Sequence, residues 1–101
     1  MYIAMNRFRI LRGKEEEFEK LWRTRDSHLS KVDGFKNFSL LKGQINNDYT
    51  LYVSHSQWES EIQFSNWTKS LAFKKAHKNA GKNQHIYQGH PEFEGFVILD
   101  L

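Results

Sequence analysis

The sequence predicts an α+β fold in which a four-stranded antiparallel sheet carries helices on one face, as in ferredoxin-like proteins. Two observations lead to this prediction. Strand-like and helix-like hydrophobic patterns follow one another in the order βαββαβ, which is typical of that topology. The chain has 101 residues, a length that suits one modest hydrophobic core and leaves no room for a second module. We therefore expect a single domain over residues 1–101.

The first strand is predicted over residues 2–11, where side chains alternate between two faces. One face is apolar with a single polar interruption and consists of Tyr2, Ala4, Asn6, Phe8 and Ile10. A buried carboxamide without partners costs about 1–3 kcal/mol. Asn6 should therefore be hydrogen-bonded, either to the backbone at a strand irregularity or to a ligand.

A helix is predicted from Lys14 to about Ser30, after Gly13 has ended the first strand. Its inward positions recur at helical spacing and are Phe18, Leu21, Trp22, Arg25 and Leu29. Acidic residues near its start suit the helix dipole. We interpret this helix as mainly structural, although Arg25 and His28 near its end are placed to reach a pocket.

The remaining elements follow the Asp33-Gly34 turn. They are two strands that form a hairpin, two helical segments and a closing strand, predicted over residues 35–42, 49–57, 58–68, 70–81 and 93–101. Because helices cover one face only, alternate strand residues would leave apolar surface bare in a monomer. We assign to this bare face Ile3, Met5, Phe38, Leu40, Val97 and Leu99. Pairing of two sheets would cover it, which predicts a homodimer.

Composition excludes several classes of protein. The absence of cysteine rules out a disulfide scaffold, thiolate metal sites and a cysteine nucleophile, and it fits a reducing compartment. No apolar run approaches 18 residues, and the N-terminus lacks the apolar core of a signal peptide. The net charge of +3 is dispersed, and no nucleic-acid recognition motif accompanies it. We therefore expect a soluble cytoplasmic protein that binds neither nucleic acid nor membranes.

The segment WTKSLAFKKAHKNAG, residues 67–81, places one histidine on the apolar face of a helix. At about 100° per residue, one narrow arc holds Phe73, Ala76, His77 and Ala80. The two alanines leave a shallow space beside the imidazole, which suits a flat ligand. Two interpretations stay open for His77 at this point, a core residue hydrogen-bonded to a backbone carbonyl or a ligand-binding residue.

Trp67 lies about 280° around a continuous helix from His77, so the two share a face only if the helix breaks between them. Lys69-Ser70 is a plausible break, with Ser70 as the cap of the second helical segment.

These features together resemble a known family. The βαββαβ order, the Asn-Arg pair of strand one, the Gly-Phe that opens strand two and the motif W-x-x-S-x-x-F-K-x-A-H are similar to the dimeric α+β barrel proteins of the antibiotic-biosynthesis-monooxygenase superfamily. More narrowly, they resemble its IsdG-type heme-degrading monooxygenases. The resemblance covers nearly the whole chain. The Asn, Trp and His that this group uses have counterparts at Asn6, Trp67 and His77.

The resemblance implies a role for each of these residues. His77 would be the axial ligand of heme iron, Trp67 would press on the porphyrin, and Asn6 would donate a hydrogen bond to oxygen on the distal side. Phe73 and Ala76 would border the heme slot. The heme propionates would pair with Arg25, Arg23 or lysines of the His77 helix, which are Lys69, Lys74, Lys75, Lys78 and Lys82.

The implied reaction uses heme as both substrate and cofactor, with O₂ and an external electron donor, either a reductase or a small-molecule reductant. Its products would be an opened, bilin-type tetrapyrrole and free iron. The loop that holds His85 and His90 departs from the pattern of the family, which leaves the pocket rim and the position of ring opening undetermined. Three alternatives stay open: a cofactor-free quinol or aromatic monooxygenase of the same fold, a non-catalytic heme-binding dimer, and a dimer in which His77 is purely structural.

Overall fold

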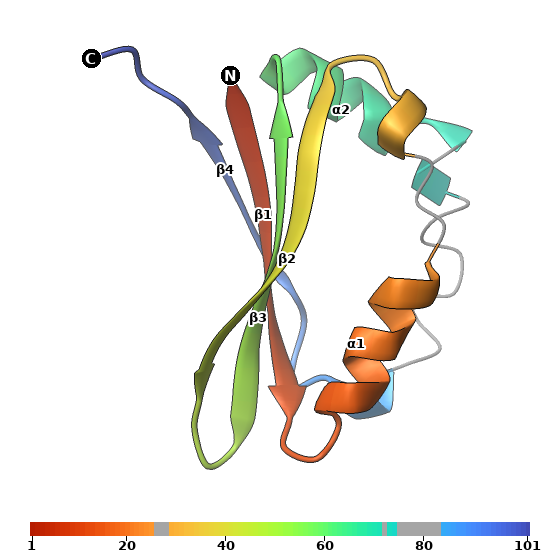
Figure 1. Cartoon of the computed structure of the whole chain (residues 1–101), viewed down its shortest axis with the longest axis vertical. Helices are drawn as coiled ribbons and strands as arrows, with labels where there is room; N and C mark the ends of the chain where they lie inside the picture. Colours follow the sequence, from red (N-terminus) through yellow and green to blue (C-terminus); the bar gives the residue numbers. More distant parts are fainter. Residues whose placement is uncertain (26–28, 72, 75–83) are drawn as a thin grey trace.

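The elements of the chain follow one another in the predicted βαββαβ order. The computed structural model describes residues 1–25, 29–71, 73–74 and 84–101. Its elements are β1 (Tyr2–Leu11), α1 (Glu15–Thr24), the 3-10 helix η1 (Leu29–Lys31), β2 (Phe35–Ile45), β3 (Tyr49–Trp58), α2 (Glu61–Thr68) and β4 (Glu92–Val97). The strands form one antiparallel sheet in the order β2-β3-β1-β4, and the helices lie on one side of it (Figure 1). The predicted α+β fold is confirmed.

Several of the predicted boundaries were wrong, among them the end of the second strand, which was predicted at Lys42 and lies at Ile45. The first helix ends at Thr24 instead of near Ser30, because Arg25 adopts an extended backbone with φ −77° and ψ 127°. Trp58 closes β3, where it pairs with Tyr2, and does not start the following helix. β4 ends at Val97 because its partner β1 begins at Tyr2, so residues 98–101 have almost no strand left to pair with.

The predicted break after the second helix is confirmed. α2 ends at Thr68, and the Ser70 hydroxyl then accepts a hydrogen bond from the backbone N–H of Phe73 at 3.1 Å. This contact is the N-cap expected of a serine that starts a new helical segment. Ala76, His77 and the predicted helix end at Gly81 lie outside the described residues.

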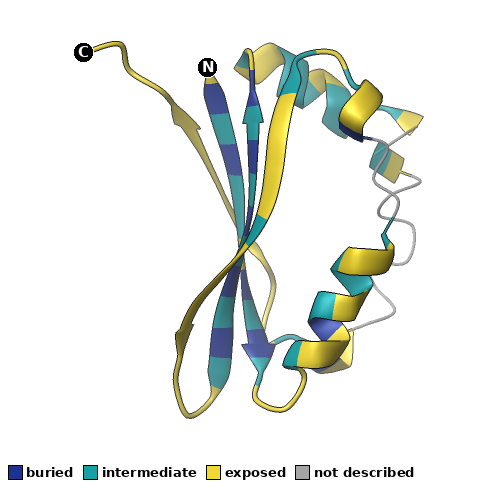
Figure 2. Cartoon of the chain, in the orientation of Figure 1, coloured by how far each residue is buried: buried dark blue, intermediate teal, exposed yellow. Residues whose placement is uncertain are grey.

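The buried side chains of the sheet form two separate clusters on its helix side. The first, here the α1 cluster, consists of Phe8, Ile10, Phe18, Tyr52 and Ile86. The second, here the α2 cluster, consists of Tyr2, Ala4, Leu29 and Trp58, with Phe64 and Trp67 of α2 packed against it. Figure 2 shows that the buried positions lie mainly in the central strands β1 and β3. Asn6 is half-buried and lies between the two clusters on β1.

The outer face of the sheet carries no helix, as predicted, but its composition differs from the prediction (Figure 1). Phe38, Leu40 and Val97 were assigned to the outer face, yet they pair with Ser56, Ser54 and Tyr2 and so lie on the helix side. A register irregularity between Phe35 and Asn37 accompanies this pairing of β2. By the same registers, the apolar outer-face residues are Ile3, Met5, Leu41, Leu51, Val53 and Phe96.

Leu99, the other residue assigned to the outer face, lies beyond β4 and is exposed. Within the described part of the chain, none of the helices combines the length and apolar character that crossing a membrane requires.

Candidate functional site

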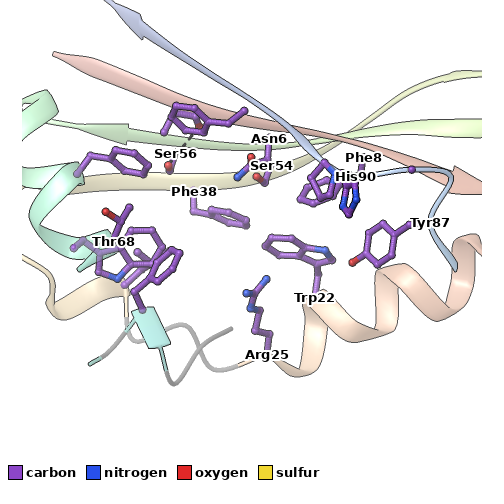
Figure 3. Close-up of a pocket in the computed structure, with 18 of the residues that line it drawn as sticks. Asn6, Phe8, Trp22, Arg25, Phe38, Ser54, Ser56, Thr68, Tyr87 and His90 are labelled. Atoms are coloured by element: carbon purple, nitrogen blue, oxygen red, sulfur yellow. Dashed lines mark hydrogen bonds between the residues drawn. The ribbon is translucent and has the colours of Figure 1, made fainter. Parts of the chain in front are cut away.

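A pocket of about 1050 Å³ lies between the sheet and the helices, where the two clusters fail to meet. Its floor is the helix side of the sheet, and its walls come from α1, α2, the segment after Ser70 and the loop before β4 (Figure 3). The volume lies at the upper end of the range for small-molecule sites. The pocket can therefore hold a large organic ligand.

Aromatic rings form most of the walls. Trp22 of α1 stacks on Phe38 of β2, with ring centroids 5.4 Å apart and planes 15° from parallel. At the opposite end, Trp67 meets Phe73 edge to face at 4.8 Å. Planar walls of this kind suit a flat, largely apolar ligand, because stacked and edge contacts both gain from extended π surface.

The floor carries a polar strip. Asn6 of β1 and Ser54 of β3 are direct cross-strand partners and both line the pocket. Neither side chain has a hydrogen-bond partner among the described residues. The register of β1 with β3 is regular at this point, so no strand irregularity is present to bind the carboxamide. Of the two expectations for Asn6, contact with a ligand is the one that the geometry favours.

Among the described residues that line the pocket, Arg25 brings a positive charge. The guanidinium of Arg25 lies 4.6 Å from the centroid of the Trp22 ring, and both side chains line the cavity (Figure 3). Burial lowers the pKa of Arg25, although an arginine keeps its charge at neutral pH. Burial also raises the pKa of the nearby Tyr87, and the charge of Arg25 partly opposes this shift. A ligand with a carboxylate at this end would meet a cation in a partly desolvated setting.

The loop before β4 closes one side of the pocket because it is attached to β1. Tyr87 forms an isolated bridge with Ile10, and the N–H of Gln88 donates to the carbonyl of Arg9 at 2.7 Å. These contacts bring Tyr87 and His90 to the pocket (Figure 3). His85, in contrast, points to α1, where its Nε2 lies 2.5 Å from a carboxylate oxygen of Glu17.

The structure brings four of the predicted site residues to one pocket: Asn6, Arg25, Trp67 and Phe73. The other two, Ala76 and His77, lie outside the described residues. Sequence reasoning missed three contributors, which are Ser54, Tyr87 and the Trp22–Phe38 stack. A signal existed for Ser54, because Tyr52, Ser54 and Ser56 are spaced two residues apart along a predicted strand. Ser54 therefore places a hydroxyl on the same face as the Tyr52 ring. The position of Tyr87 depends on its long-range bridge with Ile10, which no local sequence pattern predicts.

Comparison with known proteins places the chain among monooxygenases. Residues 1–79 match the model of the antibiotic biosynthesis monooxygenase family. A heme oxygenase (staphylobilin-producing) from Staphylococcus epidermidis is 33% identical over 87 residues, which cover 83% of this chain and 80% of that protein.

Solved structures share the fold at lower identity. A structure described as a putative antibiotic biosynthesis monooxygenase from Bacillus cereus superposes with a TM-score of 0.76 at 19% identity, covering 99% of this chain and 92% of that one. The heme-degrader MhuD from Mycobacterium tuberculosis, solved with two hemes in its active site, gives 0.70 at 24% identity and covers 100% and 99%. SnoaB, a cofactor-independent oxygenase from Streptomyces nogalater, gives 0.68 at 16% and covers 99% and 95%.

The predicted enzyme class is confirmed by these matches. The chain belongs to the antibiotic biosynthesis monooxygenase family.

Proposed function

We propose that this protein is a heme-degrading monooxygenase, which takes heme as its substrate and uses O₂ and an external electron donor to open the porphyrin. The observation that carries the proposal is the pocket, with its planar aromatic walls, its polar floor and the guanidinium of Arg25. The similarity of the sequence to a staphylobilin-producing heme oxygenase supports the same substrate. The products would be iron and a bilin-type tetrapyrrole.

The residues of the pocket fit a heme. A porphyrin is flat and apolar across its faces and carries two carboxylates at one edge. The Trp22–Phe38 stack and the Trp67–Phe73 pair supply aromatic surface for the ring. Arg25 supplies a cation for a propionate, and a guanidinium can bind a carboxylate through two parallel hydrogen bonds.

We assign the iron ligand to His77. It lies four positions after Phe73 in the sequence, which is about one turn of the predicted helix, and Phe73 lines the pocket. A break at Ser70 is what the sequence required for Trp67 and His77 to share a face, and that break is present. A neutral imidazole is a good ligand for iron, and the identity of the axial ligand sets the reactivity of a heme.

The remaining residues would position the substrate and control what reaches it. Asn6, on the pocket floor, would donate a hydrogen bond to a small ligand of the bound heme, in a pocket where such bonds are stronger than in water. Trp67 would contact the porphyrin and hold it against the sheet. Bound heme itself supplies the activation of O₂, and the chain supplies binding, orientation and exclusion of water.

The ligand assignment is tested by comparing two histidine variants. His77→Ala should leave a folded protein with much weaker heme binding and no turnover, measured from the Soret band during titration with hemin. His85→Ala is the matched control, because His85 is paired with Glu17 away from the pocket and its loss should leave the titration unchanged. Retained turnover in His77→Ala would reassign the ligand.

The same titration separates the competing functions. A cofactor-free monooxygenase predicts no Soret shift on addition of hemin; SnoaB, which shares the fold, is described as a cofactor-independent oxygenase. A heme-binding dimer without activity predicts a complex that stays intact under reductant and air.

We also propose that the protein is a homodimer in which the outer faces of two sheets pack together. That face carries Ile3, Met5, Leu41, Leu51, Val53 and Phe96, and Leu41 and Phe96 are more than 40% exposed. An apolar face of this extent on a monomer indicates an interface. Val53→Lys places a charge at its centre and should yield monomers in sedimentation velocity, whereas Asn47→Lys in the β2–β3 turn should not. A monomeric wild-type protein at micromolar concentration would contradict the proposal.

A further inference from the structure

The inward face of β3 carries a hydroxyl at each of four alternate positions, Thr50, Tyr52, Ser54 and Ser56. Three of these hydroxyls are engaged. Thr50 donates to a carboxylate oxygen of Glu15 at 2.9 Å, and Tyr52 donates to Glu19.

The third engaged hydroxyl belongs to Ser56. It accepts a hydrogen bond from the indole N–H of Trp58 at 2.9 Å and donates to the carbonyl of Ala4 at 3.5 Å. Ser56 is 9% exposed and Ser54 is 7% exposed, so the two serines are buried to a similar degree. Ser56 therefore serves the packing of the α2 cluster, and burial alone does not distinguish it from Ser54.

Ser54 is the exception in this series. Ser54 and Ser56 both line the pocket, but within the described residues only the hydroxyl of Ser54 has no hydrogen-bond partner. Its neighbours across the sheet are Asn6 on β1 and Leu40 on β2. The side chain of Leu40 offers no polar atom. The hydroxyl of Ser54 and the carboxamide of Asn6, neither of which has a partner among the described residues, are therefore adjacent on the pocket floor (Figure 3). Directly opposed residues of an antiparallel pair have Cβ atoms about 4.5–5.5 Å apart, close enough to contact one small ligand together.

We propose that Ser54 is a second hydrogen-bonding residue of the pocket, which together with Asn6 binds the small ligand that heme carries on the side facing the sheet. This inference rests on the proposed function, because heme must occupy the pocket. When a ligand displaces water from the pocket, a hydroxyl left without a partner becomes costly, and a ligand that accepts its hydrogen bond avoids that cost. Two adjacent donors also fix the orientation of the ligand better than one, since each restricts a different direction of approach.

The test compares Ser54→Ala with Asn6→Ala and with Ser56→Ala as the matched control. The first readout is the C–O stretching frequency of the ferrous heme–carbon monoxide complex, which rises when a hydrogen bond to the carbon monoxide is lost. The second is the affinity of the ferric complex for fluoride, an anion that accepts hydrogen bonds. Ser54→Ala and Asn6→Ala should both raise the C–O stretching frequency. Ser54→Ala should also weaken fluoride binding by about 3–10-fold.

Ser56→Ala should leave both readouts at their wild-type values while lowering the melting temperature, because the indole N–H of Trp58 loses its partner. Ser54→Ala should keep the wild-type melting temperature. Ser54→Thr retains the hydroxyl and should restore the fluoride affinity.

The outcomes separate this inference from the proposed function. A wild-type protein that forms no heme complex overturns both. A heme complex that does not degrade overturns the proposed turnover, and the frequencies still decide the role of Ser54. Degradation with the same frequency and fluoride affinity in wild type and Ser54→Ala overturns the role of Ser54 alone.

Discussion

The two ends of β1 and its middle meet three different environments. Phe8 and Ile10 are buried in the α1 cluster, and Tyr2 and Ala4 are buried in the α2 cluster. Between them Asn6 is only half-buried and has no side-chain partner in the described part of the chain. The same strand thus stabilises the fold at its ends and contributes to a cavity at its centre. Dividing the core in this way provides a ligand site without distorting the sheet.

The hydrogen bonds of the sheet follow the same division. At the α1 end of β3, the hydroxyls of Thr50 and Tyr52 donate to Glu15 and Glu19, two carboxylates of α1. No comparable side chain of the described residues reaches Ser54 in the gap. Polar groups near the clusters therefore contribute to folding, whereas the polar groups between the two clusters remain available to a ligand.

The largest expected effect on stability comes from breaking a cluster. Phe18 is fully buried and packs against Phe8, Tyr52 and Tyr87. Phe18→Ala should lower the free energy of unfolding by about 3–5 kcal/mol, through lost burial and the cavity left behind. Chemical denaturation measures this loss, and a loss below about 1 kcal/mol would show that the α1 cluster does not hold the fold together.

A smaller effect is expected where the α2 cluster meets β4. Gly95 faces Tyr2, and a Cβ atom at this position would overlap the hydroxyl and ring of the buried tyrosine. Gly95→Ala should lower the free energy of unfolding by about 1–3 kcal/mol through overpacking. Combining it with Tyr2→Phe should recover part of the loss, since the nearest atom is removed. Strict additivity of the two substitutions would contradict this explanation.

The stability that Glu15 contributes through its hydrogen bonds beside the α1 cluster should depend on pH. A hydrogen bond from its own backbone N–H, followed by the bond from Thr50, lowers the pKa of Glu15 to about 2. Because the folded-state pKa is depressed, this stabilisation is present above the unfolded-state pKa and is lost as pH falls towards 2. Glu15→Gln should be less stable than wild type by about 1–2 kcal/mol at pH 7, after allowance for solvent screening.

This difference between Glu15→Gln and wild type should shrink as the pH is lowered from about 5 to 3. Urea denaturation at several pH values measures it. A difference that stays constant over this range would assign the effect of Glu15 to packing instead of charge.

The smallest effect on stability is expected at Asn6, between the two clusters. Asn6→Leu removes a carboxamide that has no partner among the described residues, so the free energy of unfolding should stay within about 0.5 kcal/mol of wild type or rise. The same variant should lose heme degradation, because the hydrogen-bond donor is gone. Thermal unfolding and a turnover assay give the two values. A large loss of stability would return Asn6 to a structural role.

Local patterns predicted the parts of the fold that local chemistry determines. β1 was predicted over its observed residues because apolar side chains alternate along it. The break at Ser70 was predicted because Ser70 can cap a new helical segment, and because Trp67 and His77 can share a face only if the helix breaks between them. These features depend on residues that are close together in the sequence.

The missed features depend on long-range pairing. The inward faces of β2 and β4 follow from their registers with β3 and β1, so Phe38, Leu40 and Val97 were assigned to the wrong side. Tyr87 reaches the pocket through its bridge with Ile10. The site was therefore predictable as a set of residue types, but its walls required the register of the sheet.

Adding ascorbate in air to the wild-type protein reconstituted with hemin tests the central claim most directly. The account predicts a Soret band on binding, loss of that band under reductant, and release of iron that a ferrous chelator detects. A band that persists under reductant and air, or the absence of any band on addition of hemin, would contradict it.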